Sequence, residues 1–581
     1  MIKLYVGMAT CGTAAGATEV YEALKDEVEK SGLKNIEIVP TGCIGMCYAE
    51  PLVEIVKPDQ PPIHAIGLDA SKARKLITDY LVQGKAADYI KPAPESTKQV
   101  RIATRNCGVI NPEKIGDYIA VGGYKSLEKV LTSMTQEDVI AEIKKSGLRG
   151  RGGAGFPTGQ KWEFGLKNES DKKYIICNAD EGDPGAFMDR SILEGDPHSV
   201  LEAMAIAGYA IGADEGVIYI RAEYPLAVKR LNTAIGQAAS MGLLGNNIFG
   251  TSFNFSITLS LGAGAFVCGE ETALLNSLEG LRGEPRLRPP FPAQKGLWGQ
   301  PTVNNNVETY ANIPAIIAKG ADWFRTIGTE ASPGTKVFAL AGKVNNVGLI
   351  EVPIGTTLRD IVYEIGGGIP GGKKFKAIQT GGPSGGCISE KHLDIAVDYE
   401  TLTSIGSMMG SGGMIVMDED DCMVNIAKFY LDFTVEESCG KCTPCRIGNI
   451  RMYEILDKIT KGHGTEEDIS ELKSLGETIK ETSLCGLGQS APNPVISTIK
   501  WFPDEYEAHV KDKKCPAKAC KSLVSYVINP DKCIGCSICA KICPVNCIDG
   551  ERKKAYVINQ AICVKCGDCL PKCPVDAIEL L

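Results

Sequence analysis

The amino-acid sequence predicts a multidomain chain of α/β and α+β units with a cysteine-rich C-terminal part. Three observations predict this class. The chain has 581 residues, enough for several domains of roughly 100–200 residues each. Its 23 cysteines lie in tight groups, and two of these groups form an internal repeat near the C-terminus. In a large chain without a convincing secretory signal, such groups indicate metal or redox centres more often than disulfides.

Composition argues against several other classes of protein. The chain is 44% hydrophobic and 23% charged, which is the balance of a globular protein. A formal net charge of −9 and the lack of a basic cluster argue against nucleic-acid binding. No uninterrupted apolar run reaches the ~18 residues of a membrane span. The start, "MIKLYVGMA", has a barely basic flank, so it predicts a buried β-strand rather than a signal peptide, and we expect a cytoplasmic protein.

The N-terminal segment, residues 1–90, carries two cysteine motifs that resemble those of thioredoxin-like ferredoxins. Those proteins bind a [2Fe–2S] cluster with C-x4-C followed by C-x3-C. Here "TGCIGMCYAEP" supplies the second pair, Cys43 and Cys47, and "VGMATCGTAAGA" supplies one member of the first, Cys11. The remaining position is Val6, which cannot ligate iron. Either another residue completes the cluster, or the cluster is lost and the fold remains.

A glycine-rich loop, "GRGGAGFPTGQKW", follows from residue 150 and fits the G-x-G-x-x-G pattern. In a dinucleotide-binding βαβ unit this pattern follows a strand. The preceding segment instead predicts a helix, because Val139, Ile140 and Ile143 share one helical face and Gly147 suits the C-cap. A dense glycine loop still lets backbone N–H groups converge on an anion. The sequence therefore predicts a phosphate-binding loop outside the standard dinucleotide unit.

The segment after residue 334 predicts a small β-domain. "KVFALAG" and "VGLIEVP" alternate around "NN", which is typical of a β-hairpin, and a helical stretch follows. Further along, "ESCGKCTPCRIG" places Cys439, Cys442 and Cys445 at C-x2-C-x2-C spacing, one thiolate short of a [4Fe–4S] cluster. "SLCGLG" offers Cys485 after a stretch of helical periodicity, so we expect a helical bundle that holds this cluster, with a zinc ribbon as the minor alternative.

The C-terminal repeat carries C-x2-C-x2-C-x3-C-P twice, in "CIGCSICAKICPV" and "CVKCGDCLPKCPV". Such a run gives three thiolates to one [4Fe–4S] cluster and its fourth to the other. The first cluster would take Cys533, Cys536, Cys539 and Cys573, and the second Cys563, Cys566, Cys569 and Cys543. Two zinc sites are the alternative, but zinc does not require this exchanged spacing. Cys547 is extra: Ala577 is its counterpart in the other half, and we interpret it as a small buried residue close to a cluster.

The linker before this repeat, "EAHVKDKKCPAKAC", contains His509, Cys515 and Cys520. These are ligands suited to tetrahedral zinc, although structural sites have four and the fourth is unknown. The alternative is a pair of thiols on a hinge. The isolated cysteines are expected to be small core residues: Cys107, Cys177, Cys268, Cys387 and Cys422.

Four motifs together resemble the NADH-oxidising flavoprotein subunit of respiratory complex I, over roughly residues 100–510. They are "GRGGAGFPTGQKW", "CNADEGDPGAF", "GAGAFVCGEETAL" and "ESCGKCTPC…SLCGLG". With the two ends added, the layout resembles the flavin subunit of NAD-dependent, electron-bifurcating [FeFe] hydrogenases, and also bifurcating transhydrogenases and NAD-linked formate dehydrogenases. The domains implied are thioredoxin-like (1–90), Rossmann-like for FMN and NAD(H) (100–333), ubiquitin-like β-grasp (334–415), helical bundle (416–512), and linker with two-cluster ferredoxin (513–581).

The resemblance also implies which residues surround the cofactors. FMN would be held by the glycine loop and by three polar segments: Gly150, Arg151, Gly152, Gly153, Lys161, Asn178, Asp180, Glu181, Gly269, Glu270, Glu271, Asn305, Asn306 and Thr309. The nicotinamide nucleotide would lie against Phe156 and Phe164 with Phe291 nearby, and Glu271 would contact a ribose. The family's "DExEPG" has Asp183 here, and its "RLKPPF" has Arg288. Both departures leave open whether the chain prefers NAD or NADP.

The resemblance implies an NAD(P)-dependent oxidoreductase subunit, a diaphorase, with FMN, three [4Fe–4S] clusters and no catalytic side chain. Nicotinamide exchanges a hydride whereas clusters carry single electrons, and FMN links the two. The implied partners are a catalytic subunit, a small thioredoxin-like [2Fe–2S] subunit and external ferredoxin. An electron-bifurcating hydrogenase is favoured by the ferredoxin tail. The alternatives are a formate dehydrogenase, a transhydrogenase or a complex I-like enzyme, and a flavin-free polyferredoxin, which the flavin loop opposes.

Overall fold

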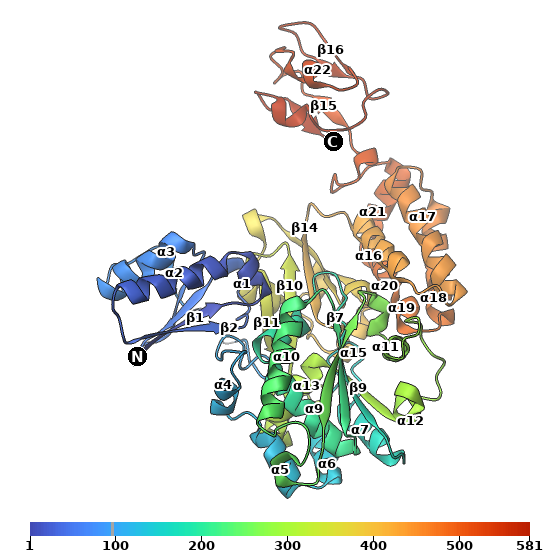
Figure 1. Ribbon diagram of the computed structural model, residues 1–581. Helices are drawn as coiled ribbons and strands as arrows, with labels where there is room; N and C mark the ends of the chain where they lie inside the picture. Colours follow the sequence, from blue (N-terminus) through green and yellow to red (C-terminus); the bar gives the residue numbers. More distant parts are fainter. Residues whose placement is uncertain (94–97) are drawn as a thin grey trace.

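The computed structural model describes residues 1–93 and 98–581 (Figure 1). The N-terminal part is a mixed five-stranded sheet in the order β2-β1-β3-β4-β5, in which β1 and β2 are parallel and the other pairs antiparallel. The strands are β1 Ile2–Gly7, β2 Ile36–Thr41, β3 Val53–Val56, β4 Ile63–Ala65 and β5 Ile90–Pro92. Helices α2 (Ala17–Lys30) and α3 (Ala70–Lys75) pack against one another beside the sheet and close a small apolar core. The predicted first strand is confirmed.

The central part is a four-stranded parallel sheet in the order β8-β7-β6-β9. Its strands are β6 Tyr174–Ala179, β7 Glu215–Arg221, β8 Ser256–Gly262 and β9 Thr302–Asn306. After β6 the chain adds β7 and β8 on one side and returns to add β9 on the other, so the strand order reverses between β6 and β9. In open α/β sheets, ligands bind at the carboxyl ends of the strands at such a reversal.

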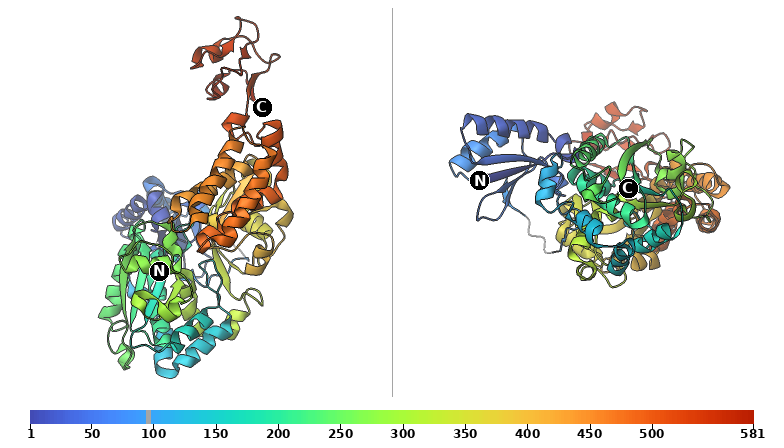
Figure 2. Two further views of the ribbon diagram at one scale, coloured as in Figure 1. Left: turned by 90° about the vertical axis from the view of Figure 1, so that its right-hand side faces the viewer. Right: turned by 60° about the horizontal axis from the view of Figure 1, so that its bottom comes forward.

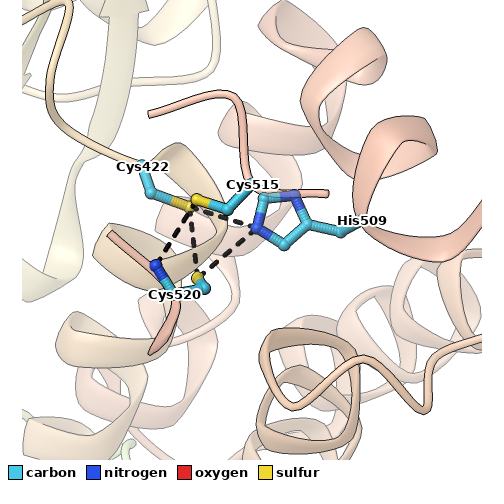
Figure 3. A group of neighbouring side chains, drawn as sticks. All are labelled: Cys422, His509, Cys515 and Cys520. Carbon is cyan, nitrogen blue, oxygen red and sulfur yellow. Dashed lines mark hydrogen bonds between the residues drawn. The ribbon is translucent and has the colours of Figure 1, made fainter. Parts of the chain in front are cut away.

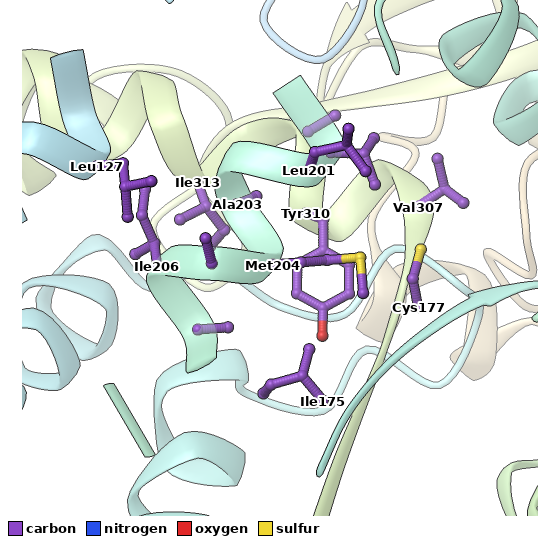
Figure 4. Close-up of a cluster of buried hydrophobic side chains, with 14 of the residues drawn as sticks. Leu127, Ile175, Cys177, Leu201, Ala203, Met204, Ile206, Val307, Tyr310 and Ile313 are labelled. Atoms are coloured by element: carbon purple, nitrogen blue, oxygen red, sulfur yellow. The ribbon is translucent and has the colours of Figure 1, made fainter. Parts of the chain in front are cut away.

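Long helices cover this sheet: α9 (Pro197–Ile211), α10 (Pro225–Ser240) and α13 (Val307–Lys319). Helix α9 is buried almost throughout, and its side chains meet those of α13 and β6 in the main hydrophobic core (Figure 4). Tyr310 lies in this core and donates to the carbonyl of Ile176, 3.0 Å away. This rigid core places the ends of β6 and β9.

The segment before the glycine loop is a helix, α6 (Gln136–Ser146), as predicted. A capping box of Thr135 and Asp138 begins it, and Gly147 ends it in the left-handed conformation at φ 69°. After the loop, the chain continues as α7 (Thr158–Lys167). The dinucleotide-binding βαβ context is therefore absent at this loop.

The β-domain that follows is a five-stranded sheet in the order β11-β10-β14-β12-β13. The strands are β10 Thr335–Gly342, β11 Gly348–Pro353, β12 Phe375–Thr380, β13 Gly386–Ser389 and β14 Gly413–Asp418. The predicted hairpin is the antiparallel pair β10–β11, and a short helix, Asp360–Ile365, follows it. One side of this domain packs on the glycine loop, where the Tyr399 hydroxyl donates to the Gly150 carbonyl at 2.9 Å.

The next part is a bundle of α16 (Met423–Glu437), α17 (Asn449–Thr460), α18 (Glu466–Thr482) and α20 (Asn493–Trp501), with the short α19 (Gly486–Ser490). The C-terminal domain projects beyond this bundle (Figure 2). It has two small antiparallel sheets of two strands each. One pairs β15 (Tyr526–Ile528) with β18 (Ile578–Leu580), and the other pairs β16 (Ile548–Asp549) with β17 (Val557–Ile558). Across the part of the chain that the structure describes, no helix is both long and apolar enough to cross a membrane.

Candidate functional site

The glycine loop lies at the reversal point of the central sheet. A Cβ on Gly152 would stand 3.0 Å from the Cβ of Asn306, the last residue of β9. Gly153 adopts φ 126°, a conformation that other residues rarely adopt, and faces Gly410 of the β-domain. The loop is thus pressed between the sheet and the β-domain, with its backbone close to the strand ends. The structure therefore brings Gly150–Gly153 together with Asn305 and Asn306.

Asp180 is a free acceptor at the end of β6. Its Oδ2 atom is shielded from solvent and has no hydrogen-bond partner among the described residues. Burial raises the pKa of Asp180 to about 7, against the opposing charge of Arg221. Asn178 holds the turn, since its side-chain oxygen accepts from the Asp180 amide at 3.1 Å and its Nδ2 donates to the Gly269 carbonyl at 2.9 Å. An unpartnered buried oxygen costs free energy until a donor arrives, so this position fits a hydroxyl-bearing ligand.

Three charged side chains form a chain along the opposite wall. The Lys161 ammonium donates to Glu271 at 3.2 Å and to the Asn304 carbonyl at 3.1 Å, and Arg288 donates to the other Glu271 oxygen at 3.3 Å. Neighbouring Glu270 caps α11 (Glu271–Leu278) by accepting from the amides of Thr272 and Ala273. Glu271, Lys161 and Arg288 remain partly exposed and able to bind a phosphate or a ribose, whereas the Glu270 carboxylate is committed to the helix.

Arg151 and Thr309, two of the residues expected around the flavin, have side chains that bond within the protein. The Arg151 guanidinium is fully buried and donates to the carbonyls of Thr335, Pro333 and Arg149. The Thr309 hydroxyl is buried and accepts from the Arg151 amide at 2.8 Å. The Arg151 guanidinium and the Thr309 hydroxyl are thus engaged within the protein, and the placement of these two residues around the flavin stays a prediction.

Glu181 is likewise turned inward. Its carboxylate accepts from the amides of Asp189 and Arg190 at the start of α8 (Met188–Gly195), at 3.0 and 3.1 Å. Burial raises its pKa, opposed by these hydrogen bonds. The bonds of Arg151 could not be seen in the sequence, since its partners Thr309 and Thr335 lie 158 and 184 residues away.

The aromatic residues expected at the nucleotide remain open to solvent. Phe156, Phe164 and Phe291 are 43%, 42% and 53% exposed, although large apolar side chains are usually buried. They belong to neighbouring elements, since α7 packs against α12 (Pro292–Lys295) directly after Phe291. Exposed rings on adjacent elements suit stacking on a base.

Asp183 lies on the far side of the loop, where Ser411 of the β-domain donates to its carboxylate. Burial raises the pKa of Asp183 to about 6. The shorter side chain thus bonds within the protein, and it lies against Gly382, whose Cβ would be 2.8 Å from it. A glutamate is one methylene longer and would have to find room beside Gly382. The sequence alone did not reveal this crowding.

The four cysteines of the bundle converge as predicted. Cys439, Cys442, Cys445 and Cys485 line one cavity together with Val267 and Pro285. The cavity lies where the π-type helix Pro444–Gly448 meets the N-terminus of α19, so helix ends surround it. Such a closed, apolar cage of four sulfurs suits an iron–sulfur cluster.

One segment links this cage to the strand ends. The short helix Phe266–Gly269 contributes Val267 to the cage wall, while its end, Gly269, accepts the Asn178 hydrogen bond. Glu437 of α16 accepts from the Phe266 amide at 2.8 Å and ties the segment to the bundle. The two centres therefore share a wall only a few residues thick.

The C-terminal domain has two further cages. One is lined by Cys533, Cys536, Cys539 and Cys573, as the exchanged assignment predicts. The other is lined by Cys543, Cys563, Cys566 and Cys569, also as predicted, and by Cys547 in addition. Both sets of four thiols fit [4Fe–4S] clusters, because each combines three cysteines of one run with the last cysteine of the other.

Four buried side chains meet where the bundle ends (Figure 3): Cys422, His509, Cys515 and Cys520. Their ligand atoms lie within 4.8 Å of one another. His509 Nε2 is 3.4 Å from the sulfurs of both Cys422 and Cys520, which are themselves 3.7 Å apart. Around tetrahedral zinc, bonds of about 2.3 Å to sulfur and 2.0–2.1 Å to nitrogen put two sulfurs about 3.8 Å apart and nitrogen and sulfur about 3.6 Å apart.

Cys422 is the residue that sequence reasoning missed. The sequence indicates a small core residue, and Cys422 is buried, but it also completes the set of four. It precedes α16 and lies 87 residues before His509, so no local spacing indicates that it is a ligand. The His509 Nδ1 atom is 2.7 Å from the Glu505 carbonyl, which orients the ring with Nε2 toward the sulfurs.

The N-terminal thiols lie at the contact with the central part. Arg190 of α8 approaches Cys11 Sγ at 3.4 Å, and Thr10 bonds Glu194 of the same helix. A hydrogen bond with Cys47 lowers the pKa of Cys11 to about 6, against burial and helped by the charge of Arg190. Val6 is buried in the apolar core, and the Glu50 carboxylate lies beside the residue that follows Cys11, since it would stand 3.1 Å from a Cβ on Gly12.

The remaining isolated cysteines are buried, as predicted for core residues: Cys107, Cys177, Cys268 and Cys387.

Comparison with known proteins adds four matches along the chain. Residues 143–315 match the Nuo51 FMN-binding domain and residues 337–388 the SLBB domain. Residues 425–509 match the NADH-ubiquinone oxidoreductase-F iron-sulfur binding region, and residues 532–577 the 4Fe-4S dicluster domain. The FMN-binding region and the regions for [4Fe–4S] clusters are thereby confirmed, as is the multidomain α/β architecture.

Individual relatives cover most of the chain. It is 66% identical over 457 residues to the NADP-reducing hydrogenase subunit HndC of Solidesulfovibrio fructosivorans, covering 79% of this chain and 93% of that one. It is 46% identical over 415 residues to a subunit of the NADH-quinone oxidoreductase of Rhizobium meliloti (strain 1021), covering 71% and 99%. Among solved structures, the NAD+-reducing [NiFe]-hydrogenase in the H2-reduced state matches with a TM-score of 0.64 and 31% identity, over 88% of this chain and 84% of that one.

Proposed function

Because the chain belongs to the family of complex I-type subunits that bind NADH and FMN, we propose that it exchanges hydride with a nicotinamide nucleotide at FMN and passes single electrons to iron–sulfur clusters. One observation carries the proposal. The segment Phe266–Gly269 forms a wall of the four-cysteine cage at Val267 and is hydrogen-bonded to Asn178 at Gly269. A flavin at the strand ends would then lie directly beside its first one-electron acceptor.

The residues at the strand ends fit FMN in separate ways. The Gly150 and Arg151 amides already donate to the Phe156 carbonyl and the Thr309 hydroxyl, so the Gly152 and Gly153 amides of the glycine loop would be the ones to bind the FMN phosphate. Asp180 would accept a ribityl hydroxyl, which satisfies its orphaned oxygen. Lys161, held by Glu271 and the Asn304 carbonyl, places a positive charge beside the ring. When bound, FMN supplies the conversion between hydride transfer and single-electron transfer.

The nicotinamide nucleotide would lie over the flavin on the exposed aromatic side. Phe156 and Phe164 would stack on the adenine, with Phe291 at the edge. Glu271 would accept from a ribose hydroxyl, and Arg288, already 3.3 Å from Glu271, adds a planar cation within reach of a phosphate. These groups bind and orient the nucleotide, and none of them has to donate or remove a proton.

Binding of FMN should depend on pH through Asp180. A hydroxyl donor favours the ionised carboxylate, so FMN lowers a pKa that burial has raised to about 7. Affinity should therefore rise as pH increases towards 7, by at most about tenfold per pH unit, and level off above it. In Asp180→Asn, refilling of FMN-free protein, followed by flavin fluorescence from pH 5.5 to 8.5, should show a weaker dependence between pH 6 and 7, because of these two carboxylates only Asp183, with a pKa of about 6, still titrates there.

The matched control is Asp322→Asn, which changes an exposed carboxylate that pairs with Lys145. It should retain the wild-type pH profile. An unchanged profile in Asp180→Asn would show that the orphaned oxygen does not meet the cofactor.

For the partner we propose an electron-bifurcating hydrogenase, in which this chain couples H2, NAD(P)+ and ferredoxin. The support is the 66% identity to a protein of an NADP-reducing hydrogenase, together with the two-cluster tail. The tail offers a branch to an external low-potential acceptor. The alternative is an NAD-reducing subunit of a formate dehydrogenase, a bifurcating transhydrogenase or a complex I-like enzyme, since the chain itself has no motif for activating H2 or formate.

The test is an assay of the co-purified complex for H2-dependent reduction of NAD+ or NADP+, with and without ferredoxin. Bifurcation predicts that reduction requires both acceptors. Equal rates without ferredoxin would contradict bifurcation, and reduction supported by formate but not by H2 would contradict the choice of partner. Parallel assays with NAD+ and NADP+ determine the nucleotide preference.

We further propose that Cys422, His509, Cys515 and Cys520 hold a structural zinc ion. All four are buried, the separations among Cys422, His509 and Cys520 are close to those of a tetrahedral site, and Cys515 lies within 4.8 Å of the other three. A [2Fe–2S] cluster at Cys11, Cys43 and Cys47 would by contrast need an oxygen ligand in place of Val6, for which Glu50 is the candidate.

Replacement of Cys422 by serine should remove this zinc. Metal analysis should fall from one zinc per chain to well below one, while the iron content stays unchanged. Loss of a structural zinc site removes free energy of folding, so proteolysis between the bundle and the C-terminal domain should become faster. Cys387→Ser, which also changes a buried cysteine but outside the four, should retain zinc.

A further inference from the structure

We propose that Cys547 donates a hydrogen bond to a ligand sulfur of the second ferredoxin cluster and thereby raises the midpoint potential of that cluster. This rests on the proposed function only in taking the two C-terminal cages as [4Fe–4S] sites. It assigns a role to a cysteine that neither cluster requires as a ligand.

In cysteine content the two cages differ by one thiol, and their linings differ also at Ser537 of the first and at Gly567 and Asp568 of the second. The first is lined by four cysteines and by Ala577, and the second by five, of which Cys547 is the extra one. The two positions correspond in the repeat, because each lies four residues after the cysteine that crosses to the other cluster, Cys543 or Cys573.

The backbone at the two positions is the same. The Ala577 amide donates to Cys573 Sγ at 3.2 Å, and the Cys547 amide donates to Cys543 Sγ at 3.4 Å. Their carbonyls accept in the same way, from Asn529 and Asn559, each at 2.7 Å. The repeat thus builds the same turn twice and differs at the side chain, where the second half has a sulfur in place of a hydrogen atom.

The geometry makes Cys547 a donor rather than a ligand. Its sulfur is 3.4 Å from that of Cys543 and the residue is 2% exposed. Each thiolate of a [4Fe–4S] cluster binds a different iron, so two sulfurs in direct contact cannot both be ligands. Cys543 belongs to the four-cysteine run, which leaves Cys547 as the free thiol. A free thiol keeps its proton near neutral pH, whereas an iron-bound thiolate has none, so the bond can only run from Cys547 to Cys543.

The bond has a defined effect on redox behaviour. Reduction adds negative charge to the cluster and its sulfurs, so a hydrogen bond to a ligand sulfur stabilises the reduced state and raises the potential. The affected cluster faces the linker, because Lys565 of its binding loop donates to the Ser522 carbonyl at 2.6 Å. Electrons on the C-terminal domain would therefore favour the cluster on the linker side.

The experiment is EPR-monitored redox titration of the full chain, with iron analysis of each variant. In Cys547→Ala, which copies the first half, one cluster should shift to lower potential. We expect about a tenfold lower ratio of reduced to oxidised cluster at a fixed potential, equivalent to a shift of about 59 mV for one electron. Cys547→Ser keeps a hydrogen-bond donor, so the midpoint potential of this cluster should shift less than in Cys547→Ala. Ala577→Cys transfers the thiol to the first half and should raise the potential of the other cluster.

Two results would overturn the inference. One is an unchanged titration in Cys547→Ala at full iron content. The other is loss of a cluster in Cys547→Ala while Cys543→Ala retains it, which would make Cys547 the ligand. Failure of the proposed function looks different: the wild-type chain would then show no pair of [4Fe–4S] signals from the C-terminal domain.

Discussion

Replacing Cys485 with alanine is expected to abolish electron transfer from the flavin to every acceptor beyond the bundle. The four bundle cysteines line one cage, and Cys485 is the member contributed from a distant helix end. Since a [4Fe–4S] cluster takes four thiolates, loss of one should lower cluster-dependent reduction by about 100-fold or more. The measurement is NAD(P)H-driven reduction of a ferredoxin or the catalytic partner, together with iron content, which should fall by one cluster per chain.

The same variant should keep the reaction at the flavin. Small oxidants such as ferricyanide can take electrons there, so that activity should stay within about threefold of wild type, because the flavin-binding residues are untouched. Cys268→Ala is the control, since Cys268 is buried in the adjoining segment but does not line the cage. If Cys485→Ala still reduced the distant acceptor, the bundle cage would not be on the electron path.

Replacing Lys336 with methionine is expected to destabilise the flavin region by about 3–5 kcal/mol, because it leaves the Glu308 carboxylate buried without a partner. Lys336 on β10 and Glu308 on α13 are 0% and 1% exposed and form an ion pair across the junction between the β-domain and the central part. Lys336 also donates to the Ser411 carbonyl at 2.6 Å, and Glu308 accepts from the Val337 amide at 2.9 Å. The loss in free energy of unfolding is measured by urea unfolding, with the release of FMN as the signal.

A surface ion pair provides the comparison. Lys145 and Asp322 are 2.6 Å apart, but their side chains are 54% and 79% exposed. Lys145→Met should therefore have little effect on the free energy of unfolding, because solvent screens an exposed ion pair. The double variant Lys336→Met, Glu308→Leu should recover much of the stability, because a buried apolar pair replaces a buried charge. Equal effects of Lys336→Met and Lys145→Met would refute the role of burial.

Much of the cofactor chemistry was predictable because its ligands are local in the chain. The runs around Cys439, Cys533 and Cys563 each place three thiolates on one short loop, so spacing alone indicates a cluster. The helix before the glycine loop was equally local, since the capping residues Thr135 and Gly147 lie at its two ends. The internal bonding of the Arg151 side chain could not be predicted, for the complementary reason. A basic residue in a glycine loop suggests a phosphate contact, and only its burial against three carbonyls reveals a structural one.

By itself, the sequence determined the FMN-binding region, the regions for [4Fe–4S] clusters and the cysteine groups that the structure gathers into three cages, because most of these features depend on residues close together in the chain. Only the tertiary structure decided which polar groups remain free for a ligand. Asp180 keeps an unpartnered oxygen while Glu181 beside it is satisfied, and Cys422 joins His509 from 87 residues away. The physical reason is that burial and hydrogen-bond satisfaction depend on neighbours brought together by packing, which no local pattern encodes.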